Sequence, residues 1–337
     1  MPNDPMKTPQ SLLPDLPTLT DRLAAALDGD DSSRHPLKVL QRKLPRFMST
    51  FPNEILTCQL ADGRKRRVFI KYEAGHGHHS YGHRGNVAYE AEVYQRLLRS
   101  LQDFRPKCLG VSADPTSGDT WLILEYVYNS VRVSDLSFHR STRQPHALVA
   151  SARWIGQFHA AHEGRVAEPS LAFLKRYDAK YYRGWAQRTF EFARPLRVRF
   201  PWLVELRNSG DEWFAPLLAA PPTVIHGEFY AKTVLIRSES LFMVDWESAA
   251  VAAGEIDLAS LTEGTGWPRK LVRQCERAYQ QARWPEAAAA QFHQTLEAAR
   301  MYLHFRWLGE QPEKAVSEKN LWRYRQLRLA AKTLGLV

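Results

Sequence analysis

The feature that most constrains this chain is a stretch, residues 223–247, in which short apolar runs alternate with acids and hydroxyls. Apolar residues in most of the second half of the chain recur at helical spacing, and this stretch is the exception. One acid stands in the polar loop after the first run, and another lies near the end of the third. Three runs have the pattern of strands: Thr223–Ile225, Val234–Ile236 and Leu241–Trp246.

The polar residues of this stretch have a spacing that suits phosphoryl transfer. Thr233 lies five residues after Glu228, and Asp245 lies twelve residues after Thr233. In phosphoryl transfer one carboxylate orients the attacking hydroxyl, while a second group and a later acid hold the metal ion that bridges the phosphates. The acids could instead cap turns and pair with arginines at the surface, as a single Asp or Glu usually does. The full ordered set favours the chemical role.

The same stretch resembles the aminoglycoside phosphotransferases, and less closely the catalytic loop of protein kinases. That family has a His-Gly-Asp loop with an asparagine five residues on, then Ile-Asp-Trp or Val-Asp-Trp, then a glycine and an Asp-Leu-Ala helix start. The likeness extends over nearly the whole chain after residue 36. Its counterparts here are His226-Gly227-Glu228, Val244-Asp245-Trp246 and Gly254-Glu255-Ile256-Asp257-Leu258-Ala259.

The resemblance implies an α+β, protein-kinase-like fold with two lobes, with ATP and Mg²⁺ as cofactors and a hydroxylated small molecule as acceptor. It also implies that Glu228 is the catalytic base, that Thr233 and Asp245 bind magnesium, and that His226 and Asp257 support the loop. Glu228 replaces the aspartate of the family pattern, and Thr233 replaces its asparagine. A glutamate still does base chemistry, whereas a hydroxyl is a neutral and weaker magnesium ligand.

Two functional hypotheses follow from this motif. The leading one is transfer of the γ-phosphoryl group of ATP to a hydroxyl of a small molecule. The alternative is a pseudokinase, a nucleotide-binding or regulatory protein whose catalysis is weakened by the threonine at position 233.

The first part of the chain has the pattern of an antiparallel sheet followed by a helix. Lys71 ends the third expected strand in the manner of the kinase lysine that contacts the α- and β-phosphates. Its partner should be a glutamate on the inner face of the next helix. At about 100° per residue, Glu90 lies within the apolar stripe and Glu92 on the outer face, so we expect Glu90. The expected strands are Leu37–Leu44, Glu54–Leu60, Arg66–Tyr72 and Thr120–Val127.

A loop and a strand end complete the predicted nucleotide site. The loop Pro45–Pro52 contains no glycine, but its backbone N–H groups, aided by Ser49 and Thr50, could hold phosphate oxygens. An ordinary hairpin loop is the alternative. Glu125, with the two residues after it, resembles the hinge whose backbone receives adenine.

The length of 337 residues suits two lobes with separate cores. We expect a nucleotide-binding lobe over 36–126 and a mainly helical lobe over 127–337, which carries the catalytic loop and the acceptor site, with ATP between them. Residues 1–35 are expected to be a flexible N-terminal segment and lead-in, because their first part is rich in proline and has no long apolar block.

Charge and composition limit the partners. The net charge of +10 attracts anions such as nucleotides and argues against a polycationic acceptor. No apolar run approaches the roughly 18 residues that span a bilayer, so we expect no membrane partner. Three widely spaced cysteines suit reduced thiols and a cytoplasmic location.

Two further clusters invite other functions. Four histidines between 76 and 83 could bind zinc, but their loop is rich in glycine and has no cysteine, so a mobile loop near the nucleotide is favoured. Basic residues interleaved with aromatic ones over 175–188 suit single-stranded nucleic acid, although a solvated helix face or part of the acceptor site would give the same pattern. A nucleic-acid-binding protein is the third hypothesis, and nucleic acid is not the partner we expect. The clusters are His76, His78, His79 and His83, and Lys175, Arg176, Lys180, Arg183 and Arg188 with Tyr177, Tyr181, Tyr182 and Trp185.

Overall fold

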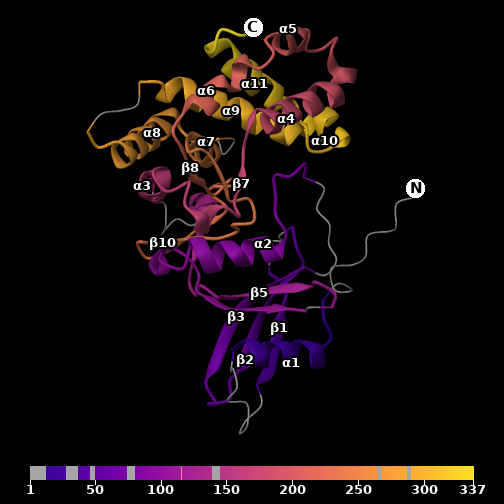
Figure 1. Cartoon of the computed structure of the whole chain (residues 1–337), viewed down its shortest axis with the longest axis vertical. Helices are drawn as coiled ribbons and strands as arrows, with labels where there is room; N and C mark the ends of the chain where they lie inside the picture. The colour runs from indigo at the N-terminus through magenta and orange to yellow at the C-terminus, as the bar shows by residue number, and fades with distance from the viewer. Residues whose placement is uncertain are drawn as a thin grey trace. The chain divides into compact units, whose positions relative to one another are not determined.

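The computed structural model of the chain describes residues 13–27, 37–45, 50–73, 80–114, 116–138, 145–263, 267–286 and 290–337. The chain folds into two compact units (Figure 1). The first comprises Met1–Ser130 and Phe242–Glu247, and the second comprises Val131–Leu241 and Ser248–Val337. From the sequence, all of 127–337 is expected in the second lobe, whereas in the structure residues 242–247 belong to the first unit.

The first unit is built on a five-stranded antiparallel sheet, which confirms the predicted meander. Gly63, in the turn between the second and third strands, has a φ of +82°, a left-handed conformation that glycine adopts at no steric cost. The fourth strand along the chain has no counterpart in the sequence analysis. In spatial order the strands are β1 (Lys38–Lys43), β2 (Asn53–Gln59), β3 (Lys65–Tyr72), β5 (Thr120–Glu125) and β4 (Cys108–Ala113).

A helix, α1 (Leu16–Leu27), covers one face of this sheet (Figure 1). Its Leu19 and Leu23 lie one helical turn apart, are fully buried, and pack in the core with strand residues such as Val68 and Ile70. This corrects the expectation of a flexible lead-in over 1–35 for the helix residues. The reason is that two leucines four residues apart suffice to bury one face of a short helix, despite the prolines before them.

The opposite face of the sheet carries the second helix, α2 (Val87–Glu92), which continues as a π-helical turn over Val93–Leu97. The side chain of Asn86 caps α2 by accepting a hydrogen bond from the Tyr89 N–H at 2.9 Å. Because side chains alternate along a strand, Lys71 points away from the α1 side, on which Ile70 and Tyr72 lie. The predicted helix is therefore present, and it faces the lysine side of β3.

The second unit is mainly helical, as predicted. Helix α9 lies at its centre and is buried on nearly every side. Helices α3 and α8 approach closely at Gly156, where an added Cβ would lie 2.7 Å from the Tyr279 carbonyl oxygen. The helices are α3 (Pro145–Glu163), α4 (Ala179–Phe192), α5 (Trp202–Asn208), α6 (Ala215–Ala219), α7 (Glu255–Thr262), α8 (Arg269–Arg283), α9 (Phe292–Leu308), α10 (Pro312–Val316) and α11 (Leu321–Thr333).

Short strands border the predicted catalytic stretch of the second unit. Strand β11 (Ala250–Ala253) pairs antiparallel with β8 (Pro222–Ile225) and parallel with β7 (Lys175–Arg176). Strand β9 (Val234–Arg237) pairs antiparallel with β6 (Val131–Arg132). Strand β10 (Ser240–Met243) follows, and its last two residues already belong to the segment of the first unit. The first two predicted runs are strands in the structure, and the third, Leu241–Trp246, is a strand only as far as Met243.

None of the helices in the described ranges has the length and apolar character needed to cross a bilayer.

His304, on the central helix α9, makes the stability of the second unit depend on pH. Burial, followed by the charges of Arg323 and Arg300, lowers its pKa to about 3, although the Glu263 carboxylate lies 3.3 Å from its Nε2. In the unfolded chain this histidine takes up a proton as the pH falls through about 6.5, whereas in the folded chain it stays neutral until about pH 3. The free energy of unfolding is therefore highest above pH 6.5 and falls as the pH drops below it.

We expect the free energy of unfolding to fall by about 2 kcal/mol from this group between pH 7 and pH 5. Urea denaturation of wild type and His304→Gln at both pH values measures the difference. His293→Gln, at an exposed position of the same helix, is the control and should leave the pH dependence unchanged. An equal pH dependence in wild type and His304→Gln would contradict the expectation.

Candidate functional site

Lys71 is the centre of a buried ionic cluster in the first unit. It lies near the end of β3, and its side chain is 4% exposed. Its Nζ donates to Glu90 Oε2 at 2.7 Å and to Asp245 Oδ1 at 2.5 Å, and lies 3.7 Å from Glu247 Oε2. Three carboxylates therefore surround one ammonium group. Of the predicted residues, the structure brings Lys71, Glu90 and Asp245 together.

Helix α2 aims Glu90 at this cluster. Glu90 is fully buried, and its second oxygen, Oε1, accepts a hydrogen bond from the Trp246 N–H at 3.0 Å. Glu92, the other candidate, is part exposed and pairs with Arg96 one turn along the helix. The carboxylate of Glu90 thus connects the lysine of the sheet to the backbone of the 242–247 segment.

Asp245 is held in an unusual backbone conformation. Its φ is +73°, in the left-handed region that non-glycine residues seldom adopt, although Asp tolerates it better than most. Such conformations cost about 1–3 kcal/mol and cluster at functional sites. The turn leaves the Asp245 side chain 27% exposed, the most accessible of the three carboxylates around Lys71.

Glu247 is a member of the cluster that the sequence analysis missed. It is 1% exposed, and its Oε1 lies 3.3 Å from Arg84 Nε. Its signal in the sequence is only its place two residues after Asp245, as a second acid beside the Val244-Asp245-Trp246 motif. Single carboxylate oxygens of Glu90, Asp245 and Glu247 all lie within 4.8 Å of one another, close enough to share a cation.

The electrostatics of the cluster favour a charged lysine. Burial lowers the pKa of Lys71, but the carboxylates of Asp245, Glu90 and Glu247 outweigh burial and raise the pKa well above its usual value. Burial also raises the pKa of Glu90, against the pull of Lys71. The cluster carries more acids than bases, so it can accept a further cation and keep Lys71 protonated.

In the second unit, Asp257 holds the start of the loop that follows β8. Its carboxylate accepts the N–H groups of His226 at 2.6 Å and Gly227 at 2.9 Å. Gly227 has a φ of +82°, and an added Cβ would lie 2.2 Å from the Ser248 carbonyl oxygen, so only glycine fits. Burial raises the pKa of Asp257 to about 6, and the two N–H groups oppose that rise. Asp257 is therefore placed as the sequence resemblance implied, as a support of the loop.

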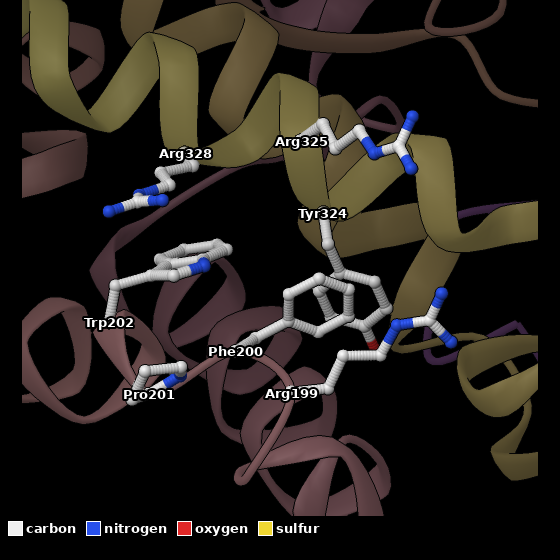
Figure 2. Close-up of a pocket in the computed structure, with 7 residues that line it drawn as sticks. All are labelled: Arg199, Phe200, Pro201, Trp202, Tyr324, Arg325 and Arg328. Carbon is white, nitrogen blue, oxygen red and sulfur yellow. The ribbon is translucent and has the colours of Figure 1, made fainter.

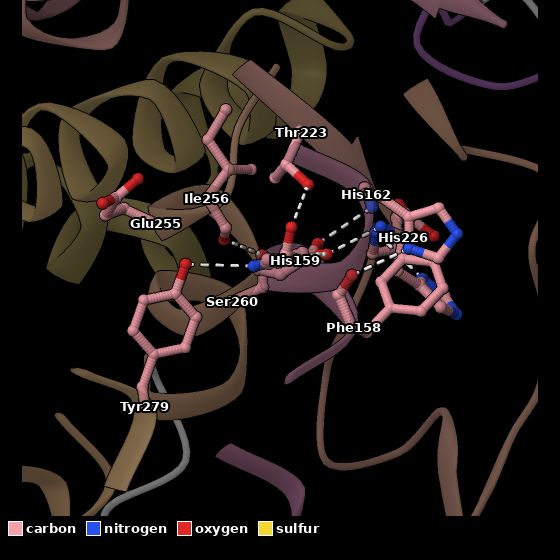
Figure 3. Close-up of polar contacts among 12 residues, drawn as sticks. Phe158, His159, His162, Thr223, His226, Glu255, Ile256, Ser260 and Tyr279 are labelled. Atoms are coloured by element: carbon pink, nitrogen blue, oxygen red, sulfur yellow. Dashed lines mark hydrogen bonds and ion pairs between the residues drawn. The ribbon is translucent and has the colours of Figure 1, made fainter. Parts of the chain in front are cut away.

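A chain of polar contacts extends from this carboxylate into the helices through His159, which Figure 3 shows with Tyr279 and Thr223. His159 Nε2 lies 3.2 Å from Asp257 Oδ2, and His159 Nδ1 lies 3.0 Å from the Tyr279 hydroxyl. Burial lowers the pKa of His159 well below its usual value, so the ring is neutral. Thr223 donates to the His159 carbonyl at 2.8 Å. These contacts fix the loop against α3 and α8.

The predicted catalytic base, Glu228, is buried in the second unit against an arginine from α9. Glu228 Oε1 lies 3.2 Å from Arg306 Nη1, and the two side chains are 4% and 1% exposed. Arg306 also donates to the Tyr230 hydroxyl, which accepts a second hydrogen bond from Trp307 Nε1 at 3.0 Å. Burial disfavours the charge of Arg306, but Tyr230 and Glu228 outweigh it and raise the pKa of the guanidinium. Arg306 lies 78 residues after Glu228 and is not among the residues predicted from the sequence.

Thr233 closes the same loop on itself. Its hydroxyl lies 2.9 Å from the carbonyl oxygens of both Glu228 and Tyr230, and donates to this pair. The threonine thus holds the two ends of the loop together. The oxygen lone pairs remain as potential metal ligands, and that role stays a prediction.

For the remaining residues predicted to contact the nucleotide, the structure shows no feature that points to this role among the described residues. Ser49 lies outside the described residues, and Thr50 is half-buried just before β2. Glu125 ends β5, where its N–H donates to the Lys107 carbonyl at 2.8 Å and its carboxylate accepts from the Lys107 N–H at 3.2 Å. The roles of Thr50 and Glu125 in binding a nucleotide stay predictions.

The aromatic rings of the segment over 175–188 are largely internal, whereas its basic residues Arg176, Lys180 and Arg183 are exposed. Tyr177, Tyr182 and Trp185 are buried, and the Tyr177 ring stacks on Tyr181 with centroids 4.0 Å apart. Rings packed in this way cannot serve as a platform for bases. Of the histidine cluster, His76, His78 and His79 lie outside the described residues, and His83 is buried.

A separate hollow of about 290 Å³ lies between α11 and the start of α5 (Figure 2). Phe200 and Tyr324 stack there with ring centroids 4.8 Å apart, and Figure 2 shows Arg328 above Trp202. None of its lining residues is a predicted site residue. The residues are Arg199, Phe200, Pro201, Trp202, Tyr324, Arg325 and Arg328.

Comparison with known proteins identifies the fold. No protein-family model and no curated protein sequence matches the chain. Among solved structures, choline kinase from Cryptosporidium parvum Iowa II is similar with a TM-score of 0.59 at 13% identity, covering 96% of this chain and 98% of that one. A putative aminoglycoside phosphotransferase from Ralstonia eutropha gives 0.59 at 14% identity, covering 95% and 97%.

A third structure is spectinomycin phosphotransferase in complex with ADP and spectinomycin, with a TM-score of 0.56 at 11% identity, covering 96% of this chain and 99% of that one. These proteins differ in acceptor but share one architecture over nearly their whole length. The chain therefore has the protein-kinase-like fold of choline kinases and aminoglycoside phosphotransferases, which confirms, at the level of the fold, the resemblance drawn from its sequence.

Proposed function

We propose that the protein transfers the γ-phosphoryl group of ATP to a hydroxyl of a small molecule. The observation that carries this proposal is the buried cluster of Lys71 with Glu90, Asp245 and Glu247. A lysine held by a helix glutamate, next to an accessible aspartate, is the arrangement that fixes a triphosphate and its metal ion in kinases. A purely structural ion pair would not need two further acids around a single lysine.

The donor atoms of the cluster suit magnesium. Mg²⁺ prefers oxygen ligands, usually one or two carboxylates with phosphate and water oxygens, and the carboxylates of Asp245 and Glu247 supply such atoms. Thr233 remains a proposed ligand through its hydroxyl oxygen. When bound, magnesium would neutralise charge that develops on the phosphate oxygens. Lys71 would hold the α- and β-phosphates, with Glu90 fixing the direction of its ammonium group.

Glu228 is the proposed acceptor of the proton. The acceptor's hydroxyl oxygen forms a bond to the γ-phosphorus while the bond from that phosphorus to the β,γ-bridging oxygen breaks, and ADP leaves with that electron pair. The hydroxyl proton passes to the Glu228 carboxylate. Arg306 would hold this carboxylate in position, which offsets the freedom that the extra methylene of glutamate brings relative to aspartate.

ATP turnover with a panel of hydroxylated metabolites tests the proposal. We expect ADP release that depends on magnesium and on one class of acceptor. Binding of ATP is measured in parallel by calorimetry, with and without magnesium. A chain that binds no ATP under either condition would refute the proposal.

One observation favours the alternative of a nucleotide-binding protein with weakened catalysis: the Thr233 hydroxyl already serves the two loop carbonyls. Thr233→Asn separates the alternatives. If wild type is a working phosphotransferase, we expect the substitution to change its rate by less than about 10-fold, since the loop already carries an oxygen ligand at this position. Phosphotransferase activity that appears only in Thr233→Asn would establish the pseudokinase hypothesis.

A further inference from the structure

Arg323, on α11, is a buried guanidinium with unused hydrogen-bond donors. Its side chain is 12% exposed, and its Nε and Nη1 atoms are buried without a hydrogen-bond partner in the structure. The nearest carboxylate oxygen among the described ion pairs, Glu263 Oε1, lies 3.5 Å from Nη1, beyond good hydrogen-bond distance. A buried donor without a hydrogen bond destabilises the protein, and more so when the group is charged.

Two indole rings hold this guanidinium. Its Cζ lies 4.5 Å from the Trp307 ring centroid and 4.4 Å from that of Trp322. A guanidinium packed against rings keeps its N–H groups at its edge, where they match the two oxygens of a carboxylate or phosphate. The two rings thus hold the guanidinium in an orientation that can bind an anion without rearrangement.

Arg323 is connected to the proposed catalytic loop through one of these rings. Trp307 donates to the hydroxyl of Tyr230, a loop residue two positions after Glu228, and the Arg306 guanidinium lies 4.9 Å from the Trp307 centroid. Two guanidiniums therefore contact the same indole beside the loop. Burial lowers the pKa of Arg323 most, Glu263 and Tyr230 raise it, and the charge of Arg306 lowers it by a smaller amount.

We propose that the acceptor carries an anionic group, a carboxylate or a phosphate, which Arg323 binds while the acceptor's hydroxyl faces Glu228. This rests on the proposed phosphotransferase function and names its substrate class. A cationic group such as an ammonium has no lone pair to accept a hydrogen bond, so it would leave the Nε and Nη1 donors of Arg323 without a partner. An anionic acceptor instead accepts hydrogen bonds from the Arg323 N–H groups that have no acceptor in the protein.

A set of sugars that differ only in charge tests this substrate class. Glucose is neutral, glucosamine cationic, glucuronate a carboxylate and glucose 6-phosphate a phosphate. Binding to the full chain without nucleotide is followed by NMR of the arginine Nε–H groups and by calorimetry, with acetate and inorganic phosphate as minimal probes. We expect the anionic sugars and the minimal anions to shift the Arg323 signal, and glucose and glucosamine to leave it unchanged. The carboxylate and phosphate arms show which anion the site prefers.

Variants of Arg323 complete the test. Arg323→Gln should weaken binding of the anionic probes by about 10- to 100-fold, because hydrogen bonds to a charged group contribute about 1.5–3 kcal/mol. Arg323→Lys, which keeps the charge but loses the planar fork, should fall between it and wild type. Arg325→Gln, at an exposed position of the same helix, is the control and should bind as wild type does.

The inference is overturned if no anion binds, if Arg323→Gln binds anions as well as wild type, or if cationic and neutral sugars bind better. Because these readouts need no turnover, they also separate the two proposals. A chain that binds anions at Arg323 but never ATP would contradict the proposed function and leave the anion site standing.

Discussion

Replacement of Asp245 by asparagine is expected to lower ATP turnover by about 10²- to 10³-fold, as loss of one preorganised electrostatic contact does in other enzymes. The substitution keeps the size of the side chain and removes the charge that would hold magnesium. Lys71 keeps Glu90 at 2.7 Å and Glu247 nearby, so no buried charge is left alone and the fold should persist. Steady-state kinetics over a range of magnesium concentrations measures the loss.

The matched control for this substitution is Glu92→Gln. Glu92 lies on the outer face of α2 and pairs with Arg96 there, so its loss should leave turnover unchanged. Thermal denaturation checks that both variants remain folded. Turnover by Asp245→Asn within threefold of wild type would remove Asp245 from the proposed mechanism.

Replacement of Arg306 by leucine is expected to destabilise the second unit by about 3–5 kcal/mol, because it removes the guanidinium that pairs with the buried Glu228 carboxylate. Urea denaturation measures the loss. The double variant Arg306→Leu/Glu228→Gln removes both charges and should recover a large part of it. That recovery would show that the cost comes from an isolated charge and not from lost packing.

An exposed ion pair provides the control for this pair of variants. Arg199 and Glu318 are 49% and 79% exposed, and Arg199→Leu should change the free energy of unfolding by no more than about 1 kcal/mol. A double variant no more stable than Arg306→Leu alone would contradict the proposed origin of the effect.

The parts of the fold that the sequence predicts are those with local signals. The meander has alternating strands and a glycine turn, and the choice of Glu90 over Glu92 needs only the geometry of one helix. Helix α1 was missed although Leu19 and Leu23 stand at helical spacing, because the prolines before them favour an irregular lead-in. Strand β4 was missed because its residues are only partly buried, so burial leaves no clear alternation in its sequence.

In the site, too, residues that stand in a local motif could be predicted, whereas partners from distant parts of the chain could not. Asp245 and Glu228 stand in recognisable motifs, whereas the partner of Glu228 comes from α9, near the other end of the second unit's chain. Arg306 carries no motif of its own, and only the packing of α9 beside the loop makes it a partner. The departure to threonine at 233 becomes interpretable only when the loop carbonyls that it bonds are seen.

The membership of residues 242–247 in the first unit has a consequence for how the chain is made. When a ribosome has released the first 130 residues, the sheet and α2 can form, but Lys71 then has only Glu90 beside it. Asp245 and Glu247 arrive more than a hundred residues later. The first unit can therefore be completed only after more than half of the second has been synthesised. A fragment that ends at residue 130 would lack two of the three carboxylates that surround Lys71.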